Sequence, residues 1–186
     1  HSPILFFAQD REIADSAEPG DIIGIPNHGT LRVGDTLSER NDVRFTGLPN
    51  FAPEILRRVV LRDPTKTKQL RKALDDLSEE GVIQVFYPEI GSNWVIGVVG
   101  QLQLDVLISR LEAEYKVDAF LEPAPYDTAR WLIGSDTALA QFISFNGGNM
   151  AKDRDGHPVF MARSSWDVGY QQEKHPDLKF SATKER

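Results

Sequence analysis

A cluster of basic side chains is the strongest chemical signal in this sequence. Seven arginines and lysines fall between Arg57 and Lys72, and Asp63 is the only acid among them. Lys68, Arg71 and Lys72 share one face of a predicted helix, away from its apolar residues. Such a run is usually a solvated helix face, but in a chain of net charge -7 it also favours a contact with phosphates or with an acidic partner.

One segment imitates a phosphate-binding loop. Residues Gly29–Thr36 match that motif except that Asp35 stands where the loop needs its lysine. A carboxylate at this position would repel the phosphates, and the segment lies between predicted hairpin strands rather than before a helix. We therefore expect a turn here, and no nucleotide or other cofactor bound by these residues.

Metal-binding and catalytic patterns are weak. The histidines share no ligand spacing, and Asp153–Gly156 begins like a calcium loop but lacks the third acidic position and the closing glutamate. We interpret it as a charged, solvated loop. The adjacent carboxylates Asp75–Asp76 and Glu79–Glu80 fall on predicted helix surfaces, where solvation is the ordinary outcome, and no serine lies in a Gly-x-Ser-x-Gly elbow. The sequence predicts neither a metal site nor catalytic residues.

Composition narrows the class of protein. The 186 residues are 40% hydrophobic and 26% charged, a balance that supports a packed core. The mean hydropathy is -0.35, and no apolar run approaches the roughly 18 residues of a membrane span, so no membrane association is expected. The absence of cysteine excludes disulfides, a zinc-thiolate site and a thiol nucleophile, and it fits a reducing cytoplasm. Because the first residue is His1, we expect the chain to be part of a longer protein.

The elements that would position these residues predict an α+β fold. Residues 1–48 are expected to form short antiparallel strands, including Ile4–Phe7 and Ile22–Ile25, which amount to part of a β-barrel; a linker is expected over Asn41–Pro53. Residues 49–125 follow the order β-α-β-β-α-β of a ferredoxin-like unit. Residues 126–186 add a second α/β subdomain. The strands expected after the linker are 55–61, 82–87, 94–99, 117–121, 129–133, 158–162 and 178–181, and the last two helices are 136–145 and 164–174.

Several segments resemble translational GTPases. Pro19–Ile25 and Gly34–Leu37 are similar to the end of the β-barrel second domain of these proteins, and Gly100–Val106 is similar to a helix start in the third domain of elongation factor G. A narrower resemblance is to the family of peptide chain release factor 3, the bacterial class II release factors. It is carried by Phe45–Glu54, Leu77–Gly81, Gln84–Phe86 and Thr128–Trp131.

This resemblance implies a GTPase that binds the ribosome and promotes dissociation of the decoding release factors in translation termination, in the cytoplasm. GTP and magnesium would be held by a domain before His1, while the residues present would contact small-subunit RNA and ribosomal protein S12. The candidate contacts to the ribosome or its RNA are Arg57, Arg58, Lys66, Lys68, Arg71 and Lys72, with Asn27 and His28 in an earlier turn.

Other interpretations are left open. A small phosphatase on a ferredoxin-like scaffold would need backbone amides at the first strand-to-helix junction, where Asp63 repels phosphate and Pro64 lacks an amide hydrogen. A stand-alone ferredoxin-like regulatory or small-ligand-binding module is the main alternative. A partial barrel would also expose strand edges and an apolar face, which predicts a homodimer through that region.

Overall fold

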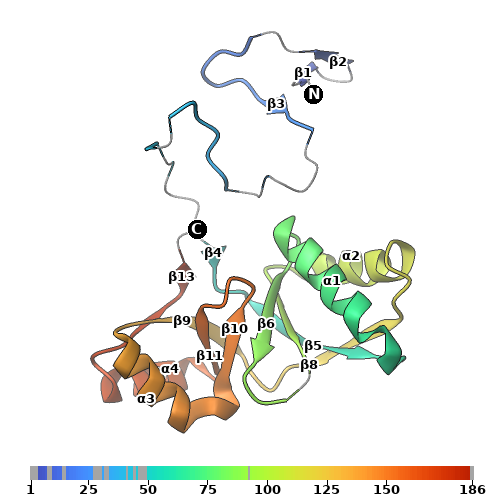
Figure 1. The fold of residues 1–186 in the computed structure, drawn as a ribbon. Helices are drawn as coiled ribbons and strands as arrows, with labels where there is room; N and C mark the ends of the chain where they lie inside the picture. Colours follow the sequence, from blue (N-terminus) through green and yellow to red (C-terminus); the bar gives the residue numbers. More distant parts are fainter. Residues whose placement is uncertain are drawn as a thin grey trace. The chain divides into compact units, whose positions relative to one another are not determined.

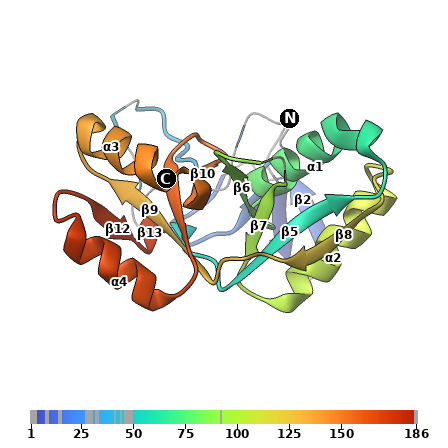
Figure 2. The same ribbon diagram turned by 90° about the horizontal axis from the view of Figure 1, so that it is seen from below.

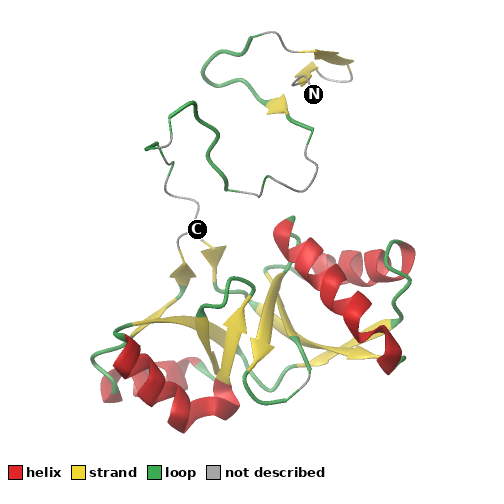
Figure 3. Ribbon diagram, in the orientation of Figure 1, coloured by secondary structure: helices red, strands yellow, loops and turns green. Residues whose placement is uncertain are grey.

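The chain forms two compact units, His1–Asp35 and Thr36–Arg186. The computed structural model describes residues 4–7, 10–13, 16–26, 31, 34–40, 42, 43, 45, 50–91 and 93–184. Figure 1 shows the course of the chain, and Figure 3 shows that the helices all belong to the second unit. Among the described residues, no helix combines the length and the apolar character that a membrane crossing needs.

The first unit contains a three-stranded antiparallel sheet. Its strands are β1 (Ile4–Phe7), β2 (Asp10–Ile13) and β3 (Ile23–Gly24), in the order β2-β1-β3. The predicted strand at Ile4–Phe7 is confirmed, β3 is shorter than predicted, and β2 was not predicted. A turn precedes β3: the Asp21 amide donates to the Glu18 carbonyl at 3.0 Å, and Gly20 has a φ of +104°.

The second unit begins with the predicted order β-α-β-β-α-β. Its secondary-structure elements are β5 (Ile55–Leu61), the short 3-10 helix η1 (Pro64–Lys66), α1 (Thr67–Glu79), β6 (Gln84–Pro88), β7 (Val95–Val98), α2 (Gln101–Ala113) and β8 (Ala119–Pro123). The Asp63 side chain accepts from the Thr65 amide at 2.9 Å and so caps η1, which leads directly into α1. Gly81 turns the chain after α1 at a φ of +77°.

The same order of elements occurs a second time. It runs through β9 (Thr128–Ile133), α3 (Asp136–Asn146), the 3-10 helix η2 (Gly147–Asn149), β10 (Met150–Asp153), β11 (Pro158–Ala162), α4 (Ser165–Lys174) and β12 (Lys179–Ser181). Ser164 caps α4, since its hydroxyl accepts from the Asp167 amide at 3.2 Å.

The two sets of strands join in one eight-stranded antiparallel sheet. Its order is β12-β9-β11-β10-β6-β7-β5-β8, so β10 of the second set pairs with β6 of the first. Figure 2 shows α1 and α2 on one flank and α3 and α4 on the other, with the strands between them. Each half has a core beneath its own helices, and a third core lies on the helix-free face, where Leu56, Phe86 and Val95 pack with Trp131 and Met161.

Two predictions for the second unit are wrong in detail. The end of the expected linker is not free: β4 (Asn50–Phe51) pairs with a last strand, β13 (Thr183–Lys184), and the Ala52 amide donates to the Ala182 carbonyl at 2.7 Å. The start of the expected solvated loop belongs to strand β10, and its Asp153 is only 7% exposed. In both cases the missing information is a partner from a distant part of the sequence, which local pattern cannot show.

Candidate functional site

The basic residues singled out from the sequence do not form one continuous surface. Arg57 and Arg58 are neighbours in β5, where successive side chains point to opposite faces of the sheet. Arg58 forms an ion pair with Glu122 of the adjacent strand, and Arg57 donates to the Leu56 carbonyl at 2.9 Å. Asn27 and His28 lie outside the described residues.

The second half of α1 neutralises its own cations. Lys72 forms an ion pair with Asp76 at 2.8 Å, and Arg71 lies 3.9 Å from Asp75. These carboxylates have further partners, because Tyr87 donates to Asp75 and Tyr115 donates to Asp76 at 3.2 Å. The interpretation of Asp75–Asp76 as merely solvated is therefore wrong.

Burial and the contacts to Asp75 and Asp76 raise the pKa values of both tyrosines. Burial, the charge of Asp76 and the hydrogen bond to it raise the pKa of Tyr115 to about 12. Burial and the bond to Asp75 raise the pKa of Tyr87 in the same direction. Desolvation and a neighbouring carboxylate both disfavour a phenolate. These side chains therefore stay neutral and fasten α1 to the rest of its half.

The beginning of α1 differs in its ion pairs. Within the described part of the chain, neither Lys66 nor Lys68 forms an ion pair with a carboxylate, and the first turn of α1 contains no acid. The amino end of a helix is the positive end of its dipole, so these lysines add to a positive potential rather than balance it. Lys66 and Lys68 are thus the members of the basic cluster best placed to meet an anion.

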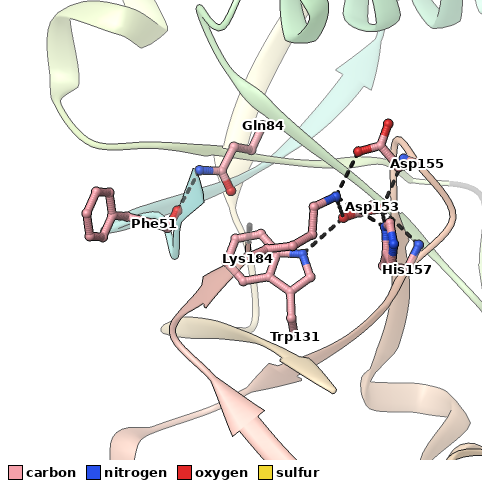
Figure 4. A network of polar contacts seen from close by, with 7 residues as sticks. All are labelled: Phe51, Gln84, Trp131, Asp153, Asp155, His157 and Lys184. Atoms are coloured by element: carbon pink, nitrogen blue, oxygen red, sulfur yellow. Dashed lines mark hydrogen bonds and ion pairs between the residues drawn. The ribbon is translucent and has the colours of Figure 1, made fainter. Parts of the chain in front are cut away.

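The stretch that resembles a calcium loop contains a polar network instead of a solvated turn (Figure 4). The Asp153 carboxylate accepts from the Trp131 indole at 3.0 Å and from the Lys184 ammonium at 2.6 Å. Lys184 also donates to Asp155 at 2.7 Å and lies 3.2 Å from Nδ1 of His157. The Lys184 hydrogen bond and charge lower the pKa of the Asp155 carboxyl.

The same network has the composition of a metal site. Asp153, Asp155 and His157 offer ligand atoms within 4.8 Å of one another, and theirs is the one such group found among the described residues. An ammonium already lies between the two carboxylates, however. Lys184 therefore supplies the positive charge that a cation would bring, and we assign the cluster a structural role.

An exposed aromatic row on α4 was not predicted. Trp166 and Tyr170 stack with their ring centres 5.4 Å apart at 12°, and the Lys174 ammonium lies 5.8 Å from the Tyr170 ring centre. Trp166 is 74% exposed. The i, i+4, i+8 spacing in the sequence could have revealed this row.

Two comparisons with protein families are informative. The sequence model of the class II release factor RF3, C-terminal domain, matches residues 45–172, which is more than two thirds of the chain. The model of elongation factor G domain 2 matches residues 1–40. The boundary between these matches falls in the segment that precedes β4.

Proposed function

Because the chain belongs to the family of the class II release factor RF3, we propose that it is the non-catalytic part of such a factor that docks on the ribosome. In this role the chain contacts small-subunit RNA and ribosomal protein S12 during translation termination in the cytoplasm. The whole factor then promotes dissociation of the decoding release factors.

We further propose that GTP and magnesium are bound by a GTPase domain outside residues 1–186. The nearest imitation of a phosphate loop in this chain has Asp35 where lysine is needed, a residue that would repel phosphate. The contribution of the present residues is then positional. Their rigid sheet transmits orientation between the ribosome and the nucleotide-binding domain.

The observation that supports docking most directly is the unpaired charge at the start of α1. Lys66 and Lys68 have no carboxylate within ion-pair distance in the described structure, so a phosphate could bind them without breaking an existing pair. Arg71 and Lys72 already face Asp75 and Asp76. We therefore expect the first two residues to contribute more to docking than the second two.

The test is the double charge reversal Lys66→Glu, Lys68→Glu in the full-length factor, measured by ribosome pelleting over a series of salt concentrations. Each lost phosphate contact should weaken binding and reduce the slope of log affinity against log salt by roughly 0.7–0.9. The matched control is Arg163→Glu, Lys179→Glu, which changes the charge equally at two exposed residues of the other half. Equal binding by the two double variants would contradict the proposal.

A further inference from the structure

Helix α4 has an outer face that the fold itself does not use. On the opposite side of the helix, Val168 packs against the core of this half, and the Gln172 side-chain amide donates to the Leu178 carbonyl at 2.6 Å. Helical spacing places Trp166 and Tyr170 away from that side, and they are 74% and 45% exposed. Exposed rings of this size mark a surface for contact with another molecule.

The two rings are held in place before any partner binds. They stack with their centres 5.4 Å apart at 12°, and the Lys174 ammonium lies 5.8 Å from the Tyr170 ring centre. Tyr170 thus has a neighbour on each side along the helix, whereas the Trp166 indole has no second ring or cation stacked on it among the described residues. Because the rings lose little freedom on binding, the open indole face is a preorganised platform for a flat group.

The surroundings of the rings favour a narrow, flat ligand over a broad protein surface. The exposed residues of α4 besides the two rings are Ser165, Gly169, Glu173 and Lys174. No aliphatic side chain of α4 therefore extends the apolar area, whereas the core of a stable protein interface needs more than two rings. No atom lies within 4 Å of a Cβ built on Gly169, so the space beside the neighbouring turn that carries Trp166 is open.

Lys174 supplies positive charge at the end of the stack. In the part of the chain that the structure describes, its ammonium forms no ion pair with a carboxylate, so an anion could reach it without breaking an existing pair. An open ring face together with such a cation matches the two parts of a nucleotide, its flat base and its phosphate.

We propose that Trp166, Tyr170 and Lys174, here called the α4 row, bind an unpaired stretch of RNA. A base stacks on the open face of the Trp166 indole and continues the column of rings, while a phosphate of the same strand lies at Lys174. This inference rests on the proposed docking on ribosomal RNA and adds a contact of another kind, because the start of α1 binds phosphate through charge alone. Double-stranded RNA does not fit the α4 row, because its bases are already stacked on one another.

Glu173 distinguishes RNA from a basic protein segment as the partner. It is exposed, adjoins Lys174 and forms no ion pair among the described residues, whereas the other acid of the helix, Asp167, is half-buried in the first turn. A carboxylate beside the row repels a phosphate but attracts a basic peptide. We therefore expect Glu173→Gln to bind single-stranded RNA more tightly.

The direct test titrates two labelled RNA probes with the 186-residue chain and follows their fluorescence anisotropy. One probe is a short adenine-rich single strand, and the other is a duplex of the same length. We expect the chain to prefer the single strand, and Trp166→Ala to weaken binding of that strand by at least about fivefold. Phe145→Ala is the matched control, because it removes an 81% exposed ring of α3 that stacks on no other ring among the described residues, and it should leave binding unchanged.

Ribosome pelleting with the full-length factor separates this contact from docking through α1. Trp166→Ala should weaken binding without changing the slope of log affinity against log salt, because stacking releases no counterions, whereas Lys174→Gln should reduce the slope by roughly 0.7. If Lys66→Glu, Lys68→Glu weakens binding and Trp166→Ala does not, the α4 contact is wrong and docking through α1 stands. If none of these variants weakens binding, the proposed docking is wrong as well.

Three further outcomes would overturn the proposal. The first is an equal preference of the unchanged chain for the single strand and the duplex. The second is weaker binding of the single strand by Glu173→Gln. The third is a crosslink from Tyr170→benzoylphenylalanine to a ribosomal protein, where the proposal expects a crosslink to RNA.

Discussion

Individual carboxylates in this protein act through partners that are distant in sequence. Asp76 lies four residues from Lys72 but also accepts from Tyr115, and Asp153 accepts from Trp131 and Lys184. A pattern of charges along the chain identifies the first kind of partner, at i+4, and not the second. For this reason both acidic stretches were interpreted as solvated from the sequence.

The Tyr115 contact predicts how stability depends on pH. A pKa raised from 10 to about 12 means that the folded state keeps the phenol proton where the unfolded state has lost it. The contribution of Tyr115 to stability is therefore complete below pH 10 and is lost as the pH rises towards 12. We expect Tyr115→Phe to make the decline in the free energy of unfolding between pH 9 and pH 12 shallower, measured by urea denaturation.

An unchanged slope for Tyr115→Phe would show that its hydroxyl is not held by Asp76 in solution.

At the scale of elements, close packing of β7 depends on a glycine. A Cβ atom built on Gly97 would lie 2.5 Å from Cγ of Pro53 and 2.9 Å from Cε2 of Phe86. Neither neighbour is the end of a flexible chain, so Gly97→Ala forces the Pro53 segment or the ring to move. We expect a loss of about 1–3 kcal/mol in the free energy of unfolding, measured by urea denaturation.

Gly169→Ala is the matched control, since no atom lies within 4 Å of a Cβ built at that position in α4. Alanine is a better helix former than glycine, so this variant should gain about 0.5–1 kcal/mol. If Gly97→Ala is at least as stable as the unchanged chain, the close approach of Pro53 to β7 is wrong.

Most of the elements could be predicted from the sequence, because their signals are local. Strand β11 was predicted at its observed bounds, and the start of α4 follows from the serine at position 164. Strands β4, β10 and β13 could not be predicted. Each has at most four residues and exists because a distant strand completes its hydrogen bonds.

The candidate site was predicted in part. The sequence showed the basic cluster, and its helical face could be deduced from spacing. It could not show that Arg58 is paired with Glu122, a residue 64 positions away. Only the structure shows that, among the described residues, no carboxylate forms an ion pair with Lys66 or Lys68.

At the scale of the whole molecule, the second unit contains the same arrangement of helices and strands twice. Both halves follow the order β-α-β-β-α-β. When the strands of each half are numbered in chain order, each half reads 4-1-3-2 from its outer edge inward to the β10–β6 pair. The halves share one sheet and a core on its helix-free face. A shared sheet and a shared core resist bending between the halves, which the proposed transmission of orientation would require.

The first unit has outer strands and exposed apolar side chains, and these features predict association with a second copy of the chain. Among the described residues, the outer strands of its sheet are β2 and β3, and Ile22 and Ile25 are 81% and 43% exposed. Open edges and bare apolar side chains favour pairing with another chain. We expect the 186-residue chain to form a homodimer through residues 1–48, detected by light scattering, whereas residues 49–186, which retain β4, stay monomeric and unfold cooperatively. If the 186-residue chain remains monomeric at high micromolar concentration, the dimer is contradicted. If residues 49–186 are unfolded on their own, the independence of the second unit is contradicted.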